Sequence, residues 1–547
     1  KQTYDYVIIC PTYLKDYIQD FKNFKELLSY KVLIMPVESI YVNYAGVDSA
    51  EKIRNFLRQN YINWNTKYML LCGDITVIPM RKCCPWDNLP QGPDTAWWES
   101  PIPTDFYYAE LSLPDSLSWN KDGDTLYGEY QDDNVDLVAE VNVGRIPFTD
   151  TTIVKQILER IERFERNVDM TFKKSSLLMG SIIYYENEDY SGYPGEDGAY
   201  LMEVLMTENI IDRDMAITLY EKAGIRPSSY QSTDSLSKSN IIRYWDNQGI
   251  MNEYNHGWLT SINRRIWMTD DGDGVPETGN NEIEGVVLFS TTDADTLTDE
   301  HPSFTFLLSC LCAKSEYLNN FAYKILKKKA SAVIGATRAA WVILGWEPDS
   351  GGAQDIDYNF FKYMLIDTGI TKSKIGDAFY KTLSHYFTIE TDAYALANIY
   401  DFNLFGDPSM KYYGVKPSIY INEDSLTFLK EVVGTTMTKI DSLDTLIIKN
   451  TGELPLIIYS IKKDSAWIKV KDVSCTLFAS QQKEIEVKVN WDSIFNNTEG
   501  TITIISNDPL NDTLKIKVIA QIGYGTVSYT HLRAHETEAD LVCRLLL

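Results

Sequence analysis

A histidine and a cysteine in this 547-residue chain follow two segments that could end at the same edge of a sheet, and the segment before the cysteine is a buried-strand run. His256 lies in the triplet NHG at 255–257, and Cys310 ends the run FTFLLSC at 304–310. An imidazole beside a thiol can generate or stabilise the thiolate, which is the form that attacks a carbonyl carbon. The backbone N–H groups of Gly257 and Cys310 could then hold the developing oxyanion. These residue types in this pattern indicate acyl transfer through a cysteine nucleophile.

The same residues also have a structural interpretation. A cysteine at a strand end is usually a small hydrophobic residue, and a lone His-Gly pair is usually part of a loop. Cys312 shares a strand face with Cys310 because side chains alternate with a period of two, so periodicity does not choose between them. The histidines at His301 and His385 are expected at surface or packing positions.

The elements that would position His256 and Cys310 follow an alternating pattern. In residues 1–148, strands are expected at 6–10, 32–36, 68–72 and 138–143, with helices through 28 and at 50–60. In residues 149–413, strands are expected at 176–185, 304–309 and 332–334, and helices at 151–168, 198–207, 318–329 and 356–366. Such alternation predicts two α/β subdomains with mostly parallel sheets covered on both faces. The ends of adjacent parallel strands share one edge, where His256 and Cys310 can meet.

The remainder of the chain has a different pattern. Residues 414–524 contain short alternating runs separated by Asn-Thr-Gly and Asn-Asp-Pro turns, which predict an all-β, immunoglobulin-like sandwich. Residues 525–547 share no pattern with the sequence before them and resemble translated sequencing adapter. The histidines and the cysteine of this non-native-looking tail are therefore left out of the argument.

Several ordered motifs carry a resemblance to a known family. These motifs are CGDITVIP at 72–79, PTDFYYAEL at 103–111, VNVGRIP at 141–147, NHG, FTFLLSC, SAVIGATRAAW at 331–341 and FGDPS at 405–409. They resemble the gingipain-type cysteine peptidases of the caspase-like clan over residues 1–413. The resemblance implies two caspase-like α/β/α subdomains, His256 as the general base and Cys310, rather than Cys312, as the nucleophile. The chain carries Cys312-Ala313 where the gingipains have Asn-Gly.

The resemblance also implies roles for two acids and a tryptophan. Glu186 is implied as the acid that orients the catalytic histidine, and Asp197 as the acid that binds a basic P1 side chain. Trp341 is implied as a wall of the P1 pocket. A buried aspartate selects Arg or Lys by charge and hydrogen bonding. The alternative for both acids is a solvated acidic loop, and the sequence leaves the two interpretations open.

Two acidic clusters have spacings typical of calcium loops. Asp122 and Asp124 lie in WNKDGDTLYGEYQDD, and a second cluster lies in TDDGDGVPE; the second cluster consists of Asp270, Asp271, Asp273 and Glu277. Such spacing directs several carboxylates at one hard cation across a glycine turn. Neither segment is a complete EF-hand loop. We expect structural Ca²⁺ at one of them, and ordinary Asp-Gly turns are the alternative.

Composition limits the partners. Acidic residues number 77 and basic residues 51, which gives a net charge of −26. This balance argues against a nucleic-acid groove, and no apolar run is long enough to span a membrane. Eight scattered cysteines form neither a disulfide framework nor a zinc pattern. The chain starts at Lys1 without a signal-peptide pattern, so any targeting segment is expected outside it.

The combined hypothesis is a secreted or cell-surface cysteine endopeptidase that acts on proteins or peptides, with Arg or Lys as the candidate P1 residue. A sortase-like transpeptidase that uses the same chemistry is one alternative. The other is a catalytically inactive, calcium-binding surface or adhesion protein.

Overall fold

The computed structural model describes residues 2–86, 101–366, 374–433 and 436–524. The chain divides into two compact units, Lys1–Val415 and Lys416–Leu547. The boundary expected between 413 and 414 lies close to this division, and the boundary expected between 148 and 149 falls inside the first unit. The tail expected at 525–547 lies outside the described residues.

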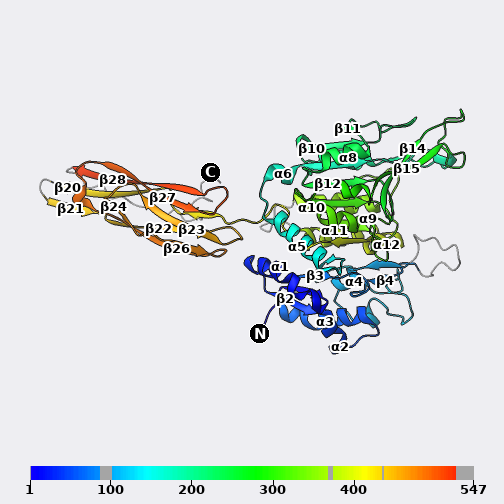
Figure 1. The fold of residues 1–547 in the computed structure, drawn as a ribbon, viewed down its shortest axis with the longest axis horizontal. Helices are drawn as coiled ribbons and strands as arrows, with labels where there is room; N and C mark the ends of the chain where they lie inside the picture. The colour runs from blue at the N-terminus through cyan, green and yellow to red at the C-terminus, as the bar shows by residue number, and fades with distance from the viewer. Residues whose placement is uncertain (1, 87–100, 367–373, 434–435, 525–547) are drawn as a thin grey trace, which may run out of the picture. The chain divides into compact units, whose positions relative to one another are not determined.

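One large sheet runs through the first unit (Figure 1). Its strands, in spatial order, are β11 (Asp234–Ser235), β10 (Ala216–Tyr220), β7 (Ser176–Gly180), β12 (Ile250–Tyr254), β16 (Ser303–Leu308), β17 (Ala330–Ala336), β18 (Phe402–Phe405), β6 (Asn142–Ile146), β3 (Tyr68–Cys72), β1 (Tyr6–Cys10) and β2 (Val32–Pro36). Neighbours pair in parallel except β17 and β18, which are antiparallel. The expected α/β fold class is confirmed, and the strands of both predicted subdomains join in one sheet at β18.

The central strands are buried along their whole length because both of their faces are covered. Every residue of β1, β3, β12, β16 and β17 is buried, as expected for parallel strands between helical layers. The two faces are seen at β16, where Phe304 and Phe306 pack against Phe360 of α10 (Gly352–Leu365). Ser303 lies on the opposite face and accepts a hydrogen bond from the indole of Trp245 in α8 (Lys238–Trp245).

The remaining helices follow local capping signals. They are α1 (Lys15–Leu27), α2 (Val37–Asn43), α3 (Ser49–Trp64), α4 (Phe106–Ala109), α5 (Thr151–Arg166), α6 (Met170–Lys174), α7 (Gly198–Thr207), α9 (Phe321–Lys328), α11 (Ile375–Ile389) and α12 (Ala393–Asp401). Asp48, Asp150 and Asp197 cap α3, α5 and α7 by accepting backbone N–H groups of the first turn. Glycine contributes elsewhere by allowing close approach, as at Gly198, whose N–H donates to the carbonyl of Ser181.

Two expected strands differ from the observed ones. The run at 176–185 divides into β7 and β8 (Ile182–Tyr184), because the N–H of Ser181 turns to the carbonyl of Tyr254. β8 then pairs with β9 (Glu196–Asp197) outside the main sheet. The strand expected at 138–143 is observed at Asn142–Ile146, since Leu137 has a φ of 60° and Val138 is exposed.

A separate three-stranded antiparallel sheet follows β12. It consists of β13 (His256–Trp258), β14 (Ser261–Trp267) and β15 (Ile283–Ser290). β13 begins two residues after β12 ends, so this small sheet extends directly from the edge of the large one. A two-stranded ribbon of β4 (Arg81–Cys83) and β5 (Ile102–Thr104) lies elsewhere in the unit.

The second unit is a β-sandwich, which confirms the immunoglobulin-like expectation. One sheet holds β19 (Ile419–Ile421), β22 (Leu443–Asn450), β26 (Gln482–Val489) and β24 (Ile468–Val470), and the other holds β21 (Thr436–Ile440), β20 (Ser425–Val433), β28 (Thr513–Tyr524), β27 (Thr498–Ser506), β23 (Leu456–Lys463) and β25 (Cys475–Leu477). Alternating residues such as Leu446, Ile448, Ile485 and Val487 form the core between the sheets. Asn450 holds the Asn-Thr-Gly turn by donating to the carbonyls of Leu454 and Leu477.

Candidate active site

The strand register brings the His-Gly and cysteine segments to one edge of the large sheet. β12 and β16 pair in parallel, with Tyr254 opposite Leu308 at their carboxyl ends. His256 and Cys310 each follow two residues later. Two parallel strands that end in register place the residues after them side by side, as the sequence pattern predicted.

Gly257 lies directly against the backbone of Cys310. A Cβ atom at Gly257 would be 2.1 Å from the carbonyl oxygen of Cys310 and 2.8 Å from its nitrogen. Both distances are far shorter than any real carbon contact, so only glycine fits at this position. The pair His256-Gly257 is therefore fitted to the backbone that carries Cys310.

A strained turn presents Cys310. The next residue, Leu311, has a φ of 61°, the left-handed region that a bulky residue rarely adopts. The turn is held because the N–H of Leu311 donates to the carbonyl of Arg338 at 2.7 Å. Strain of this kind persists where surrounding structure enforces it, and it is frequent at reactive sites.

The same turn separates the two candidate thiols. Cys310 is partly exposed, whereas Cys312 is completely buried. The Sγ of Cys312 lies 3.8 Å from the carbonyl oxygens of both Trp258 and Ser261. Only Cys310 of this pair is accessible to a substrate, which agrees with the choice that the motif resemblance implied.

A backbone carbonyl holds the imidazole of His256. Its Nε2 lies 2.9 Å from the carbonyl oxygen of Ile183 in β8. Because a carbonyl can only accept, Nε2 carries the hydrogen and Nδ1 is left as the acceptor nitrogen. The acid expected to orient the ring, Glu186, is exposed, and the Ile183 carbonyl occupies the orienting position at Nε2.

Two charged side chains, Arg265 of β14 and Glu188, lie beside this anchor. Arg265 also donates to the Ile183 carbonyl, at 3.3 Å, and forms an ion pair with the buried Glu188. Glu188 in turn accepts the N–H of Tyr185 at 3.1 Å. The segment that carries the Ile183 carbonyl is thus fixed from two sides.

Burial keeps both reactive groups neutral. Burial is the main cause that lowers the pKa of His256 to about 4, with the Arg265 charge adding to the effect. Burial also raises the pKa of the Cys310 thiol to about 11. Near neutral pH the site therefore holds a thiol and a neutral imidazole, which is a base able to accept the thiol proton during attack.

The residues implied for substrate binding lie near this pair. Asp197 pairs with Ile182 across β8 and β9, one residue from the Ile183 anchor. It is partly buried, and burial raises its pKa. Trp341 follows Ala340, whose carbonyl oxygen lies 4.0 Å from the Sγ of Cys310.

The Trp341 ring belongs to an aromatic cluster. It packs edge-on against Tyr394 and Trp86, with ring centroids 4.8 Å and 6.4 Å away. Its backbone is fixed by Asn398, which accepts the N–H and donates to the carbonyl at 2.9 Å each. The Trp341 ring and backbone are thus both held in place, one residue after the Ala340 carbonyl that lies near Cys310.

The comparisons with known proteins agree with this geometry. The family model of Peptidase family C25 matches residues 1–413. The chain belongs to peptidase family C25. It is thus a cysteine-type peptidase, a hydrolase whose substrates are proteins or peptides, and the gingipain-type resemblance is confirmed.

Solved structures show the same fold. The Arg-specific cysteine proteinase gingipain R (RgpB) matches with a TM-score of 0.54 and 15% identity, over 96% of this chain and 99% of that one. A complex of the Porphyromonas gingivalis RgpB pro- and mature domains matches with a TM-score of 0.54 and 15% identity, over 94% and 100%. No curated protein matches this chain in sequence. Within the described residues, no helix of this C25 peptidase is long and apolar enough to cross a membrane.

Sequence reasoning missed three groups at the site of this C25 peptidase. The Ile183 carbonyl is a backbone atom, so no residue type could signal it. Glu196 is buried and accepts the N–H groups of Gly345 and Trp346 at 2.9 Å and 3.4 Å. Its position between two glycines, beside Asp197, was the available signal. Glu253 lies in β12 within an otherwise uncharged strand, and that isolated charge was also visible.

One of the two predicted calcium loops gathers its acids around a buried carboxylate. Oxygens of Asp122, Asp124 and Glu129 lie within 4.8 Å of one another. Glu129 is 5% exposed, and its Oε2 is buried without a hydrogen-bond partner among the described residues. Burial, followed by the neighbouring carboxylates, raises the pKa of Glu129 to about 7. This donor set fits a hard cation.

The second predicted loop connects β14 to β15. Asp270, Asp271 and Asp273 approach one another within 4.8 Å, and Asp271 and Glu277 also approach Glu282. Their oxygens already accept backbone N–H groups. Gly272 and Gly274 donate to Asp270, and Val275 donates to Asp273. These bonds are typical of Asp-Gly turns.

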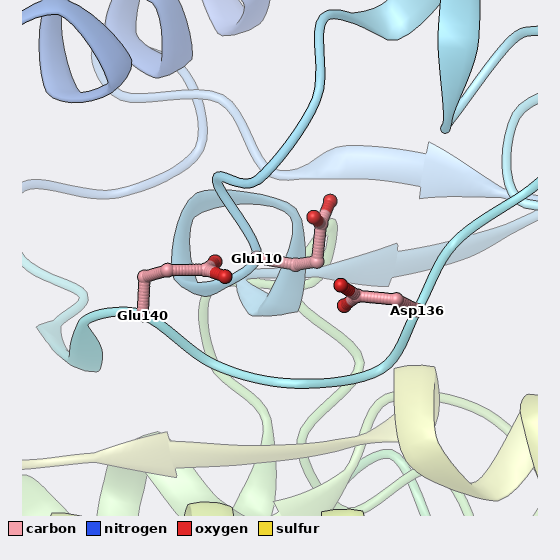
Figure 2. Close-up of side chains that lie close together, drawn as sticks. All are labelled: Glu110, Asp136 and Glu140. Carbon is pink, nitrogen blue, oxygen red and sulfur yellow. The ribbon is translucent and has the colours of Figure 1, made fainter.

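A third acidic group contains none of the acids of either loop. Figure 2 shows Glu110, Asp136 and Glu140 turned toward a common space. Glu110 is completely buried and is neutralised by Arg54, at 2.9 Å, while the indole of Trp119 donates to it at 2.6 Å. Because protein donors already satisfy Glu110, this group is explained by ion pairing and carries no cation proposal.

Proposed function

We propose that this C25 peptidase is an endopeptidase in which Cys310 is the nucleophile and His256 is the general base. The observation that carries the proposal is the fit of Gly257 against the Cys310 backbone, which leaves no room for a side chain. That fit unites the two segments through backbone contact, and both lie at the strand ends where open α/β folds bind ligands.

The proposed reaction starts from neutral groups. Nδ1 of His256 accepts the proton of the Cys310 thiol while the sulfur attacks the carbonyl carbon of the scissile peptide bond. The N–H groups of Gly257 and Cys310 stabilise the oxyanion. The imidazolium gives its proton to the leaving amine, and the acyl-enzyme remains on Cys310. Water then attacks the thioester while His256 accepts its proton; the C–S bond breaks, the acid product leaves, and the imidazolium returns the proton to the sulfur of Cys310.

Asp197 and Trp341 supply the proposed P1 preference. Asp197 is partly buried and lies next to the anchor of His256, and Trp341 directly follows Ala340, whose carbonyl oxygen lies 4.0 Å from the Sγ of Cys310. A carboxylate at the end of such a pocket favours Arg or Lys. Gingipain R, which shares the fold, is described as Arg-specific, and this supports the same proposal.

A peptide library with one fixed P1 residue per pool tests this function. We expect cleavage after Arg or Lys, its loss in Cys310→Ala, and a drop of at least about tenfold in kcat/KM for Asp197→Asn. Cleavage after other residues would retain Cys310 and reject Asp197 as the selector. Adding an amine nucleophile distinguishes the transpeptidase alternative, because transfer would yield an amide product at the expense of hydrolysis.

We also propose that Ca²⁺ binds at Asp122, Asp124 and Glu129 and stabilises their loop. The unpartnered Oε2 of Glu129 favours this cluster over the one that contains Asp270, Asp271, Asp273 and Glu277. Calorimetric titration with Ca²⁺ should show a site that Glu129→Gln weakens and Asp271→Asn leaves intact. The reverse pattern would assign the ion to the loop between β14 and β15.

A location outside the cell or at its surface is the remaining proposal. The net charge of −26 and the attached sandwich unit support it. Fractionation of the native source, followed by immunodetection, should find the peptidase in the medium or on the cell surface. Detection only in the cell interior would contradict the proposal.

A further inference from the structure

Glu253 is a buried carboxylate between the strands that carry the proposed catalytic pair. It lies in β12, opposite Leu307 of β16, and its side chain is completely buried. Within the described residues, no Lys, Arg or His forms an ion pair with it. A carboxylate in such surroundings is costly unless hydrogen bonds compensate.

Glu253 accepts two hydrogen bonds, and each donor lies next to one of the two proposed catalytic residues. Oε2 of Glu253 accepts from Nδ2 of Asn255 at 2.7 Å, and Oε1 accepts from Oγ of Ser309. Asn255 immediately precedes His256, and Ser309 immediately precedes Cys310. One carboxylate thus joins the last residue before the base to the last residue before the nucleophile.

The Ser309 branch extends into the turn that presents Cys310. Oγ of Ser309 also lies 3.3 Å from Sγ of Cys312, which is buried beneath the turn. Burial is the main cause that raises the pKa of Glu253 to about 7, and the bonds from Ser309 and Asn255 oppose the rise. The carboxyl group is therefore connected to the strained turn and to the His-Gly segment at once.

We propose that Glu253 is a positioning residue that sets the separation of the His256 imidazole and the Cys310 thiol. It acts through Asn255 and Ser309 and does not contact substrate. The inference rests on the proposed roles of His256 and Cys310. Proton transfer and attack require a well-defined geometry, and displacement by about 1 Å can lower a rate by about 10²-fold.

Asp357 provides a matched control. It lies in α10, is completely buried, and accepts a hydrogen bond from Nδ2 of Asn252, also in β12, at 2.9 Å. Burial likewise raises its pKa. Neighbouring side chains of a strand point to opposite faces, so Asn252 is directed away from the Glu253 cluster. Loss of Asp357 therefore removes a buried carboxyl group without removing a hydrogen bond of the connection between Asn255 and Ser309.

The experiment compares kcat, KM and Tm for the full chain and for Glu253→Ala, Glu253→Gln and Asp357→Ala. We expect Glu253→Ala to lower kcat about 10²-fold with KM within about threefold. Glu253→Gln should recover most of kcat, because Oδ1 of Asn255 is buried without a partner among the described residues and can accept the new amide. Asp357→Ala should lower Tm while kcat stays within about threefold of wild type.

Equal losses of kcat in Glu253→Ala and Asp357→Ala, at temperatures well below both Tm values, would overturn the proposal. If Glu253→Ala does not fold, Asn255→Ala, Ser309→Ala and their double variant replace it. If Asn255 and Ser309 act through one connection, the double variant should lose less kcat than the product of the two single fold-losses. A double loss equal to that product would reject the connection.

A wild-type chain without any turnover would instead contradict the proposed function. The alkylation rate of Cys310 in the same variants then reports its surroundings directly. Unchanged rates across the Glu253 variants would reject the positioning role as well.

Discussion

At the residue scale, the site is defined by two neutral groups whose pKa values burial moves apart. The pKa of His256 is lowered to about 4 and that of the Cys310 thiol is raised to about 11. A resting thiolate–imidazolium pair would require the opposite order. In the proposed mechanism the proton therefore moves when substrate is present, with His256 as the base during attack.

The reactivity of free Cys310 should reflect this order. Because its thiol pKa is raised, the thiolate fraction at pH 7 is small, and alkylation by iodoacetamide should speed up steadily as pH rises from 7 to 10. The measurement is the rate of Cys310 modification by mass spectrometry, with Cys310→Ala reporting modification of other thiols. A rate that is already constant between pH 6 and 8 would show a preformed thiolate and contradict the account.

At the element scale, β8 and β14 fix the orientation of the His256 imidazole. β8 supplies the Ile183 carbonyl, and β14 supplies Arg265, which binds both that carbonyl and Glu188. The orientation of the His256 ring depends on these strands because, among the described residues, a backbone carbonyl and not a carboxylate side chain accepts from Nε2.

Removing both members of the ion pair between Arg265 and Glu188 should change the pH dependence of kcat/KM. The Arg265 charge lowers the pKa of His256, so the double variant Arg265→Met with Glu188→Gln should raise it. The acidic limb of the kcat/KM profile should then move to higher pH, by less than about one unit since burial is the larger cause. Glu188→Gln alone serves as the control. A limb that stays in place, or moves to lower pH, would contradict this assignment.

Strands of the large sheet could be predicted from the sequence where a continuous apolar run marks a buried strand. The runs at 6–10, 32–36 and 68–72 coincide with β1, β2 and β3 because uninterrupted apolar residues signal buried strands. The small sheet of β13, β14 and β15 was not predicted, since its polar residues show no clear alternation. Its arrangement depends on contacts with β8 and on the turn at Cys310, which are distant in the chain.

The candidate site was predictable only as residue types. Sequence order indicated His256, Gly257 and Cys310, and the structure brings the segments together. The orienting group at Nε2 could not be found, because Ile183 contributes a carbonyl that every residue possesses. Glu186, expected in that role, is exposed. Backbone groups become specific only when the fold positions them.

At the scale of the whole molecule, one sheet joins both parts of the first unit. β18 pairs antiparallel with β17 and parallel with β6. Next to this junction, Asp105 pairs with the buried Arg145, and the Asp105 N–H donates to Asn403 of β18 at 2.8 Å. Since strand direction reverses at β18, the N-terminal strands end at the opposite edge from His256 and Cys310. Their contribution to the site is therefore structural support.

The division after Val415 predicts independent folding of the first unit. A chain of residues 1–415 should keep kcat/KM within about threefold of the full chain and unfold in one cooperative transition. Calorimetry together with peptide cleavage measures both properties. Loss of folding, or a loss of activity above about tenfold, would show that the sandwich stabilises the peptidase unit.

The most direct test of the central claim is covalent capture of the nucleophile. The full chain is treated with peptidyl acyloxymethyl ketones that carry Arg, Lys or Ala at P1, and the modified peptide is identified by mass spectrometry. The account predicts an adduct on Cys310 that is lost in His256→Ala, with Cys312 unmodified. An adduct on Cys312, or equal labelling of Cys310 without His256, would contradict it.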